Sequence, residues 1–367
     1  MQAGQRNFGL DIVRSIAIIS VLICHWYFLS DNKDLNAFLN IKIFSLLSWF
    51  SGVNLFFVLS GYLIGKIIIT LFSKELSISN IKTFYIRRWF RTLPLYYLSL
   101  LIYLLLRYDI NVFSSFFLKF IFFLQTFDKN FYSIFFFPVS WSLAVEEWFY
   151  LLLPLILFVF FKKNLKQTNL YIKIIALITL ITFVKIGYTL LSNQNLDLGT
   201  QSFLPFRFDS LLTGVVFASL KINNQDIFEK FLNKKTIIIC FILFFISYNI
   251  INFYAQSKIF LIFQNIIFPV IINFVGAIFI IFFENNKFIN TKLKKISLIR
   301  HFFEKTSLYS YSMYLFHLIL YAFYRAVFSN PDELFMPILI CLGTIYLFSA
   351  LIYRYYEKPI MDMRERF

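Results

Sequence analysis

The first apolar segment of the chain carries an arginine and a histidine where ionisable side chains are costly. Residues 10–29 are apolar apart from a few positions that include Asp11, Arg14 and His25, and charged groups inside lipid are candidates for function. Eleven residues of α-helix turn through about 1100°, which places Arg14 and His25 within about 20° of one face and about 16 Å apart. One helix would therefore present a guanidinium and, further along, an imidazole. A signal peptide is the alternative, which the interrupting charges and the later apolar segments disfavour.

A cluster of arginines follows in the motif IRRWFRTLP. Arg87, Arg88 and Arg91 stand three and four residues apart, so they are neighbours on one helical face, which we expect to end before Pro94. Guanidinium groups bind phosphate oxygens in bidentate pairs. Together with Arg14, the cluster could hold a phosphate-bearing donor. A basic loop that only fixes the orientation in the membrane is the alternative.

Two adjacent carboxylates lie in the apolar motif WSLAVEEWFYLLLP. Glu146 and Glu147 are costly there unless one is protonated or each has a partner. Beside a histidine they could orient the imidazole, raise its basicity or hold an acceptor hydroxyl. An ion pair with Arg207 or Arg325 that fastens helices together is the structural alternative.

Further polar residues in apolar segments could line a path through the protein. Ser60 and Gly61 are small residues in mid-segment, which favours close packing of helices. Tyr311, Tyr314 and His317 stand at three-residue steps and form a polar strip, although a histidine satisfied within the core is an equal alternative. The candidate path-lining residues are Asp11, Ser60, Arg207, Tyr311, Tyr314, His317 and Arg325.

The composition places the chain among polytopic membrane proteins. Of 367 residues, 59% are hydrophobic and 15% are charged, as in helical membrane bundles. The net charge of +16 fits basic loops on one side of a membrane and an anionic ligand there, and no soluble segment is long enough for a nucleic-acid-binding domain. Metal-ligand spacing is absent, so we expect no metal and read the cysteines as packing residues: Cys24, Cys240 and Cys341.

We predict an all-α membrane helix bundle with about ten transmembrane helices and a re-entrant segment near 112–127. No repeat or linker divides the chain, so we expect one domain over 1–367 with no appended soluble domain. The predicted crossing segments are 9–29, 43–72, 93–106, 139–161, 171–191, 205–220, 236–254, 261–283, 308–328 and 335–353.

The loop charges orient this bundle with both termini in the cytoplasm. If 112–127 returns to the side from which it enters, the loop lysines and arginines gather on the cytoplasmic side, as the positive-inside rule requires. The basic loop residues left outside are Lys33, Lys42, Arg107, Lys129 and Lys258. Arg14 then lies near the inner arginine cluster. The ionisable residues expected in the outer third are His25, Glu146, Glu147, Arg207, Asp209 and Arg325.

The order of motifs resembles the acyltransferase-3 family of integral membrane acyltransferases. Arg14 precedes His25 by eleven positions, and the motifs that follow are FFVLSGYLI, RRWFRTLP, WSLAVEEWFYLLLP, RFDSLLTG, YSMYLFH and EKP. The resemblance covers essentially the whole chain. Many relatives append an SGNH-type extracytoplasmic domain, which we do not expect on this chain, and Trp148 stands where relatives often show glutamine.

The resemblance implies transfer of an acyl group, usually acetyl from cytoplasmic acetyl-CoA, to a carbohydrate hydroxyl of the bacterial envelope. It also implies importance for Arg14, His25, Arg87, Arg88, Arg91, Glu146 and Glu147. We therefore expect a multi-pass enzyme of the bacterial inner membrane, in contact with membrane lipids, that acetylates an envelope glycan. Lipopolysaccharide O-antigen is the expected acceptor; peptidoglycan, exopolysaccharide and small molecules are alternatives.

In this hypothesis the arginine cluster holds the phosphates of acetyl-CoA on the cytoplasmic side, and Arg14 guides the pantetheine arm. His25 is the general base on the acceptor hydroxyl or carries the acetyl group itself, with Glu146 and Glu147 as further catalytic residues. The glycan, free or linked to lipid, enters from the periplasmic side. A transporter of an anionic glycolipid or solute is the alternative from another class, because polar membrane residues suit it equally well.

Overall fold

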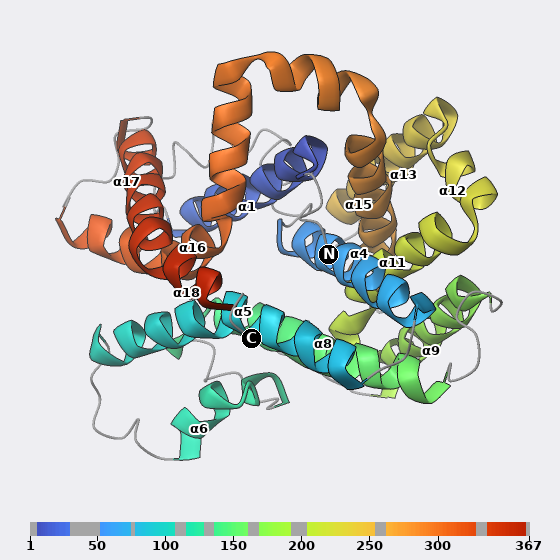
Figure 1. Cartoon of the computed structure of the whole chain (residues 1–367), viewed down its shortest axis with the longest axis horizontal. Helices are drawn as coiled ribbons and strands as arrows, with labels where there is room; N and C mark the ends of the chain where they lie inside the picture. The colour runs from blue at the N-terminus through green and yellow to red at the C-terminus, as the bar shows by residue number, and fades with distance from the viewer. Residues whose placement is uncertain are drawn as a thin grey trace. The chain divides into compact units, whose positions relative to one another are not determined.

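The computed structural model describes most of the chain, and every regular element in the described part is helical (Figure 1). Thirteen of these elements are α-helices, which confirms the prediction of a polytopic helical membrane protein. The described residues are 6–29, 52–74, 78–106, 115–127, 136–160, 169–191, 204–253, 262–327 and 336–364.

Seven helical segments in the described part are long and apolar enough to cross a membrane. Five lie in α1 (Phe8–Leu29), α4 (Gly52–Lys74), α5 (Ile78–Leu106), α8 (Ser140–Phe160) and α9 (Leu170–Leu191). The sixth, Asn265–Asn285, includes α15 (Phe268–Asn285), and the seventh, Leu339–Met363, begins in α17 (Met336–Ile352) and ends in α18 (Lys358–Met363). The predicted crossings at 205–220, 236–254 and 308–328 are also helical, but they are not among the seven. They form α11 (Leu204–Asn223), α13 (Lys234–Phe253) and α16 (Ser297–Val327).

The described part of the predicted re-entrant segment is too short to cross. It consists of α6 (Ser115–Ile121) and the 3-10 turn η2 (Gln125–Phe127). Seven residues of helix extend about 10 Å, against about 30 Å of hydrocarbon. Phe123 has a left-handed backbone, with φ of 57°, which separates the two helical pieces. The re-entry of 112–127 stays a prediction.

Helix α5 continues through Pro94, so the expectation that it ends before this residue is wrong. Proline removes a backbone donor, and membrane helices tolerate it where neighbouring side chains satisfy the freed backbone groups. Three hydroxyls also donate to carbonyls of α5 around this proline. Thr92 Oγ1 donates to the carbonyl of Arg88, Tyr311 Oη donates to that of Thr92, and Tyr356 Oη donates to that of Pro94, at 3.2, 2.8 and 3.2 Å.

The described residues group into two compact units, each described here by itself. The first unit draws on the ranges Met1–Phe56, Ile86–Tyr103 and Ile280–Phe367, and the second on Phe57–Tyr85 and Leu104–Phe279. Both units take segments from distant parts of the sequence. The expectation of one domain over 1–367 stays a prediction.

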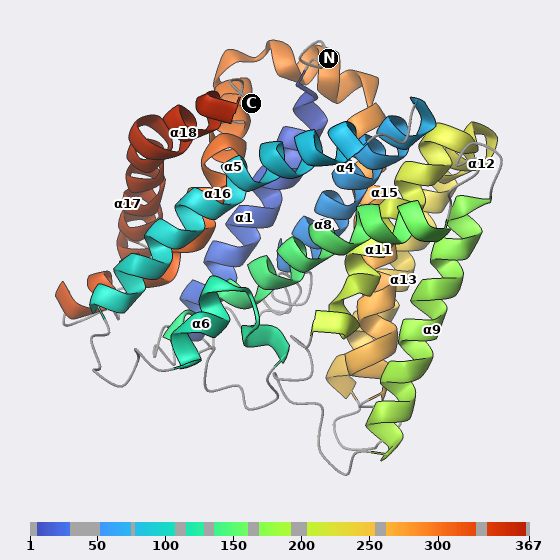
Figure 2. The same cartoon turned by 60° about the horizontal axis from the view of Figure 1, so that its bottom comes forward.

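In the first unit, α1 packs along α16, and α16 packs against α17 (Figure 2). The cytoplasmic end predicted for α1 is fixed by an apolar cluster of Phe8, Ile12 and Ile289, with Phe283 and Phe303 packed against it. These contacts join the beginning of the chain to its last third. They position the polar residues of α1 against α16.

In the second unit, α11 packs against α8 and α9. It also touches α4 backbone to backbone. A Cβ added to Gly61 would lie 1.9 Å from the carbonyl oxygen of Leu211, and one added to Gly214 would lie 2.1 Å from that of Val58. Only glycine fits at these two positions, which agrees with the close packing that the small residues indicate.

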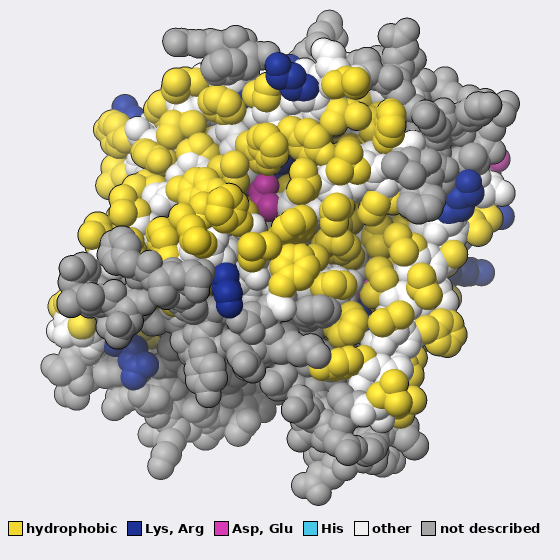
Figure 3. All heavy atoms as spheres, turned by 90° about the horizontal axis from the view of Figure 1, so that it is seen from below, with side chains coloured by type: hydrophobic (Ala, Val, Ile, Leu, Met, Phe, Trp, Pro, Cys, Tyr) yellow, Lys and Arg dark blue, Asp and Glu magenta, His cyan; other side chains and the backbone are white. Residues whose placement is uncertain are grey.

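The outer surface of the second unit is strongly apolar along α9. Only 11% of the apolar stretch of α9 is buried inside the protein, and the side chains of Leu180, Phe183 and Val184 are exposed. Figure 3 shows one face on which hydrophobic side chains cover most of the described surface and charged side chains are few. Such a surface is suited to contact with lipid tails rather than water.

Candidate active site

Two histidines from distant parts of the chain meet in the first unit. His25 lies on α1 and His317 on α16, and their ring centroids are 4.9 Å apart with an interplanar angle of 59°. His317 is fully buried. The sequence marks both residues as candidates but does not bring them together, because 292 residues of chain separate them. We call His25 and His317 the imidazole pair.

Backbone hydrogen bonds fix the tautomers of the pair. Nδ1 of His25 lies 2.9 Å from the carbonyl oxygen of Val21, and Nδ1 of His317 lies 2.7 Å from that of Tyr314. A carbonyl oxygen only accepts, so each Nδ1 carries the hydrogen and each neutral ring keeps its lone pair on Nε2. Within the described residues, the buried Nε2 of His317 has no hydrogen-bond partner. The pair therefore offers two basic nitrogens in an apolar setting.

Aromatic side chains enclose the imidazole pair. The ring of Tyr321 lies 5.7 Å from that of His317, and the ring of Trp26 lies 5.5 Å from that of Tyr321. Tyr321 Oη donates to the carbonyl of Leu22 at 2.7 Å and so ties α16 to α1. This packing excludes water from one side of the pair and holds both rings in place.

Arg14 is held by a polar network at the other end of the same face of α1. Arg14 Nη1 donates to Ser307 Oγ at 3.1 Å, and Ser307 Oγ donates to Asp11 Oδ1 at 2.8 Å. Asp11 is buried, lies 3.7 Å from Arg14 Nη1, and also accepts a hydrogen bond of 2.7 Å from Arg6 Nε. Asp11, predicted to line a path, therefore balances the charge of Arg14 and fixes its position.

The arginine cluster of α5 belongs to the same unit. Arg88 and Arg91 lie near enough to Arg14 for their charges to act on it. Arg87 and Arg91 are exposed, and Arg88 is half-buried. The hydrogen bond from Tyr311 to the backbone of α5 anchors this helix to α16, so Tyr311 positions the cluster.

The carboxylates Glu146 and Glu147 lie on α8 in the second unit. Glu146 accepts hydrogen bonds from Ser60 Oγ at 2.8 Å and from Tyr150 Oη at 2.7 Å, and Tyr150 Oη also lies 3.0 Å from Ser60 Oγ. Glu147 is 9% exposed. The approach of these carboxylates to the histidine stays a prediction, because the two groups belong to different units.

Asp209 pairs with a lysine that the sequence analysis did not single out. Lys185 Nζ on α9 lies 2.5 Å from Asp209 Oδ2 on α11, and both side chains are buried. Arg207, two residues before Asp209, has its guanidinium 5.7 Å from the ring centroid of Phe57 and 5.5 Å from that of Trp141. The available signal for this ion pair was Lys185, which stands among apolar residues in the middle of α9.

Other functional expectations have mixed outcomes. Tyr314, a candidate for the path, packs its ring against His317 at 5.9 Å and supplies the carbonyl that holds its Nδ1. Arg325 is exposed in the last turn of α16.

Tyr150 was not among the residues predicted from the sequence, although its position four residues after Glu146 places both on one helical face. Cys240 and Cys341 are buried and Cys24 is half-buried.

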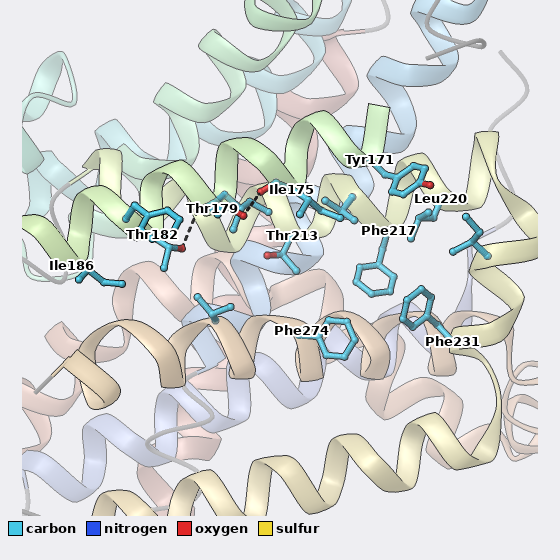
Figure 4. Close-up of a pocket in the computed structure, with 15 residues that line it drawn as sticks. Tyr171, Ile175, Thr179, Thr182, Ile186, Thr213, Phe217, Leu220, Phe231 and Phe274 are labelled. Atoms are coloured by element: carbon cyan, nitrogen blue, oxygen red, sulfur yellow. Dashed lines mark hydrogen bonds between the residues drawn. The ribbon is translucent and has the colours of Figure 1, made fainter. Parts of the chain in front are cut away.

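A separate cavity of about 510 Å³ lies within the second unit, between α9, α11, α15 and the short helix α12 (Gln225–Phe231) (Figure 4). Its wall is apolar, with Phe217, Phe231 and Phe274 at one end. The hydroxyls of Thr179 and Thr182 donate to carbonyls of their own helix, at 2.9 Å each. The cavity is lined by none of the predicted site residues.

Comparison with known proteins agrees with the motif order. A sequence model of the acyltransferase-3 family, described as an acyltransferase domain, matches residues 7–354. "Peptidoglycan O-acetyltransferase OatA" of Listeria monocytogenes is 30% identical over 201 residues, which cover 48% of this chain and 28% of that protein. "Putative O-acetyltransferase SACOL0978" of Staphylococcus aureus is 26% identical over 391 residues, which cover 96% of this chain and 56% of that protein.

The chain spans little more than half the length of the staphylococcal relative and a smaller share of the listerial one. No solved structure matches it. The family model nevertheless covers nearly all of the sequence, including α1 with Arg14 and His25, α5 with the arginine cluster, α8 with the carboxylates and α16 with His317. The chain therefore belongs to the acyltransferase-3 family.

Proposed function

We propose that this protein is a membrane O-acetyltransferase that moves acetyl from cytoplasmic acetyl-CoA to a hydroxyl of an envelope glycan. The observation that supports the proposal best is the tautomer of His25. Its Nδ1 is occupied by the carbonyl of Val21, so its basic nitrogen is Nε2, the atom that a general base or an acyl carrier needs. The same helix carries Arg14, close to the charges of Arg88 and Arg91.

The arginines form the donor side of the proposed site. Coenzyme A carries several phosphate charges, and guanidinium groups bind phosphate through paired, charge-assisted hydrogen bonds. Arg87 and Arg91 are exposed and would meet the nucleotide in the cytoplasm. Arg14, held by Asp11 and Ser307, would stand beside the pantetheine arm as the thioester approaches His25.

The transfer needs one proton to move twice. The acceptor hydroxyl oxygen attacks the thioester carbonyl carbon while its proton passes to Nε2 of His25; the carbon–sulfur bond then breaks, and the thiolate of coenzyme A takes up the proton. In the carrier variant, Nε2 attacks the thioester carbonyl carbon and the carbon–sulfur bond breaks, which releases the thiolate of coenzyme A. The hydroxyl oxygen then attacks the acetyl carbon, the carbon–nitrogen bond breaks, and the hydroxyl proton passes to the thiolate. An acetylated enzyme isolated without acceptor would favour the second variant.

The carboxylates of α8 are proposed to hold the acceptor. Glu146 accepts hydrogen bonds from two neutral hydroxyls, Ser60 and Tyr150. A sugar hydroxyl offers the same donor chemistry, so it could replace one of them. Glu147, nearly buried, would act beside it.

The acceptor is an envelope glycan in this proposal, with two candidates. The sequence analysis favours lipopolysaccharide O-antigen. Peptidoglycan is the second candidate, because it appears in the name of the relative from Listeria and in that of a protein from Bacillus subtilis, 30% identical over 165 residues. We also propose that both termini lie in the cytoplasm, since the basic loops would then lie inside.

The decisive experiment gives the purified full chain, in lipid nanodiscs, acetyl-CoA labelled in the acetyl group together with isolated O-antigen or peptidoglycan fragments. We expect label on one of these glycans with wild type and none with His25→Ala. His301→Ala, which changes an exposed histidine of α16, is the matched control and should transfer normally. A transporter would label neither glycan, and that result would refute the proposed activity.

A further inference from the structure

His317 is buried against His25 in a way that packing alone does not explain. Its side chain is fully buried, and its Nε2 is without a hydrogen-bond partner among the described residues. An unsatisfied buried polar atom destabilises the fold, so its retention calls for an explanation. A phenylalanine could fill the same space without this cost.

The hydrogen bonds of the pair give the two rings the same tautomer. In each ring the Nδ1 hydrogen is directed to a carbonyl one helical turn earlier, from Val21 for His25 and from Tyr314 and Met313 for His317. In each neutral ring the proton-accepting atom is therefore Nε2. The centroid distance of 4.9 Å puts the rings in contact, so a proton taken up by His25 would place a positive charge beside the ring of His317, whose Nε2 has no hydrogen-bond partner among the described residues.

We propose that His317 is the proton partner of His25, so that the imidazole pair together stores the single proton released by the acceptor hydroxyl. This inference rests on the proposed function. The proton moves from the hydroxyl to Nε2 of His25, is shared with Nε2 of His317 while the carbon–sulfur bond breaks, and leaves to the thiolate of coenzyme A. The pair ends neutral, so no further acid or base is required. His317 acts through His25 and is a positioning residue.

The groups around the pair suit this role. The titratable side chains that face it are Tyr314 and Tyr321 of α16, by ring contact with His317. Cys24 of α1 and Cys341 of α17 lie within electrostatic range of Tyr321. All four are neutral at ordinary pH. A proton taken up here is therefore best stabilised by the second imidazole.

Two substitutions separate proton sharing from hydrogen bonding. His317→Gln places an amide near the position of Nε2 that can accept a hydrogen bond but cannot take a proton. His317→Asn keeps a donor near Nδ1 for the carbonyl of Tyr314 and removes the outer nitrogen. We expect both variants to lower kcat by about 100-fold, in the range of general acid–base catalysis, with the KM for acetyl-CoA within twofold of wild type.

His301→Gln, on the same helix but exposed, is the control and should leave kcat unchanged. Full activity of His317→Gln would overturn the inference, because a hydrogen-bond acceptor would then suffice. Equal losses in kcat and in the amount of folded protein for both variants would also overturn it, since that pattern marks a structural role.

A second measurement does not depend on activity. The chain has three histidines, so ¹⁵N-histidine labelling with His301→Gln and His317→Gln assigns every ring by NMR. We expect the Nδ1–H tautomer in both rings of the pair, and one coupled protonation step in which their signals move together. In His317→Gln the half-protonation pH of His25 should move by about one unit or more. Independent titration of the two rings would overturn the inference even if acetyl transfer were confirmed, whereas wild type without transfer would refute only the proposed function.

Discussion

The imidazole pair of the first unit and the Lys185–Asp209 pair of the second unit use their buried polar groups differently. Each joins two helices through buried polar side chains. Lys185 and Asp209 form an ion pair of 2.5 Å, and Asp209 Oδ1 also accepts from the backbone nitrogen of Ser210 at 2.8 Å. His25 and His317 instead direct their hydrogens to the backbone and keep their Nε2 lone pairs.

The difference indicates that the ion pair stabilises the fold and that the imidazole pair is available for chemistry. A buried ion pair is tightly matched, and removal of one partner leaves an uncompensated charge. A neutral imidazole whose lone pair is not used in packing is available to a proton or an acyl group. Substitutions in the ion pair should therefore act on stability, and substitutions in the imidazole pair should act on turnover.

The largest effect is expected at His25. His25→Ala should lower acetyl transfer by about 10³-fold or more, since it removes the proposed base, while thermal unfolding in detergent stays within a few degrees of wild type. The measurement is transfer of labelled acetyl alongside a melting curve from the same preparation. If the variant lost activity only in proportion to its folded fraction, His25 would have a structural role like that of the ion pair, and the contrast between the two pairs would be wrong.

The second effect concerns stability. Lys185→Met should lower the free energy of unfolding by about 3–5 kcal/mol, because it leaves Asp209 buried without its cation. The double change Lys185→Met with Asp209→Leu removes both charges and should recover most of this loss. Unfolding in denaturing detergent measures both variants. Equal destabilisation by the single and double changes would show that the pair is not the source of the stability.

A third and smaller effect is expected for the donor. Arg91→Ala should raise the KM for acetyl-CoA by about tenfold with little change in kcat, which corresponds to one charge-assisted hydrogen bond to phosphate. Steady-state kinetics at fixed ionic strength measure it. Arg300→Ala, at another exposed arginine, is the control. An unchanged KM would remove Arg91 from the donor site.

The smallest effect is expected at Glu146. Ser60→Ala removes one of the two hydroxyls that donate to this carboxylate and should destabilise the protein by about 1 kcal/mol. The KM for the glycan should change by a few-fold, because a sugar hydroxyl would fill the vacant position. Tyr150→Phe is the parallel variant. A loss of several kcal/mol in either variant would place Glu146 with the structural carboxylates.

Local patterns were sufficient to find the elements of the site. Helical periodicity placed Arg14 and His25 on one face of α1. In the structure this face packs on α16, where Arg14 contacts Ser307 and His25 contacts His317. The short segment near 112–127 and the close approach at Gly61 also follow from length and residue size. These features depend on residues within about three helical turns of each other.

Features that depend on distant segments could not be read from the sequence. The meeting of His25 with His317 requires α1 to lie against α16, which no local pattern states. The ion pair of Asp209 with Lys185 depends on the register of α9 against α11, which no local pattern gives. The end predicted for the helix at Pro94 was wrong, and hydroxyls from distant segments, Tyr311 and Tyr356, bind the backbone of α5 at Thr92 and Pro94.

The indole of Trp148 on α8 contacts the segment 115–127. Its Nε1 donates to the carbonyl of Phe123 at 2.9 Å, and its ring meets that of Phe127 at 5.5 Å. Trp148 directly follows Glu147 in the chain. This hydrogen bond therefore attaches α8, directly beside the carboxylates, to the turn at Phe123.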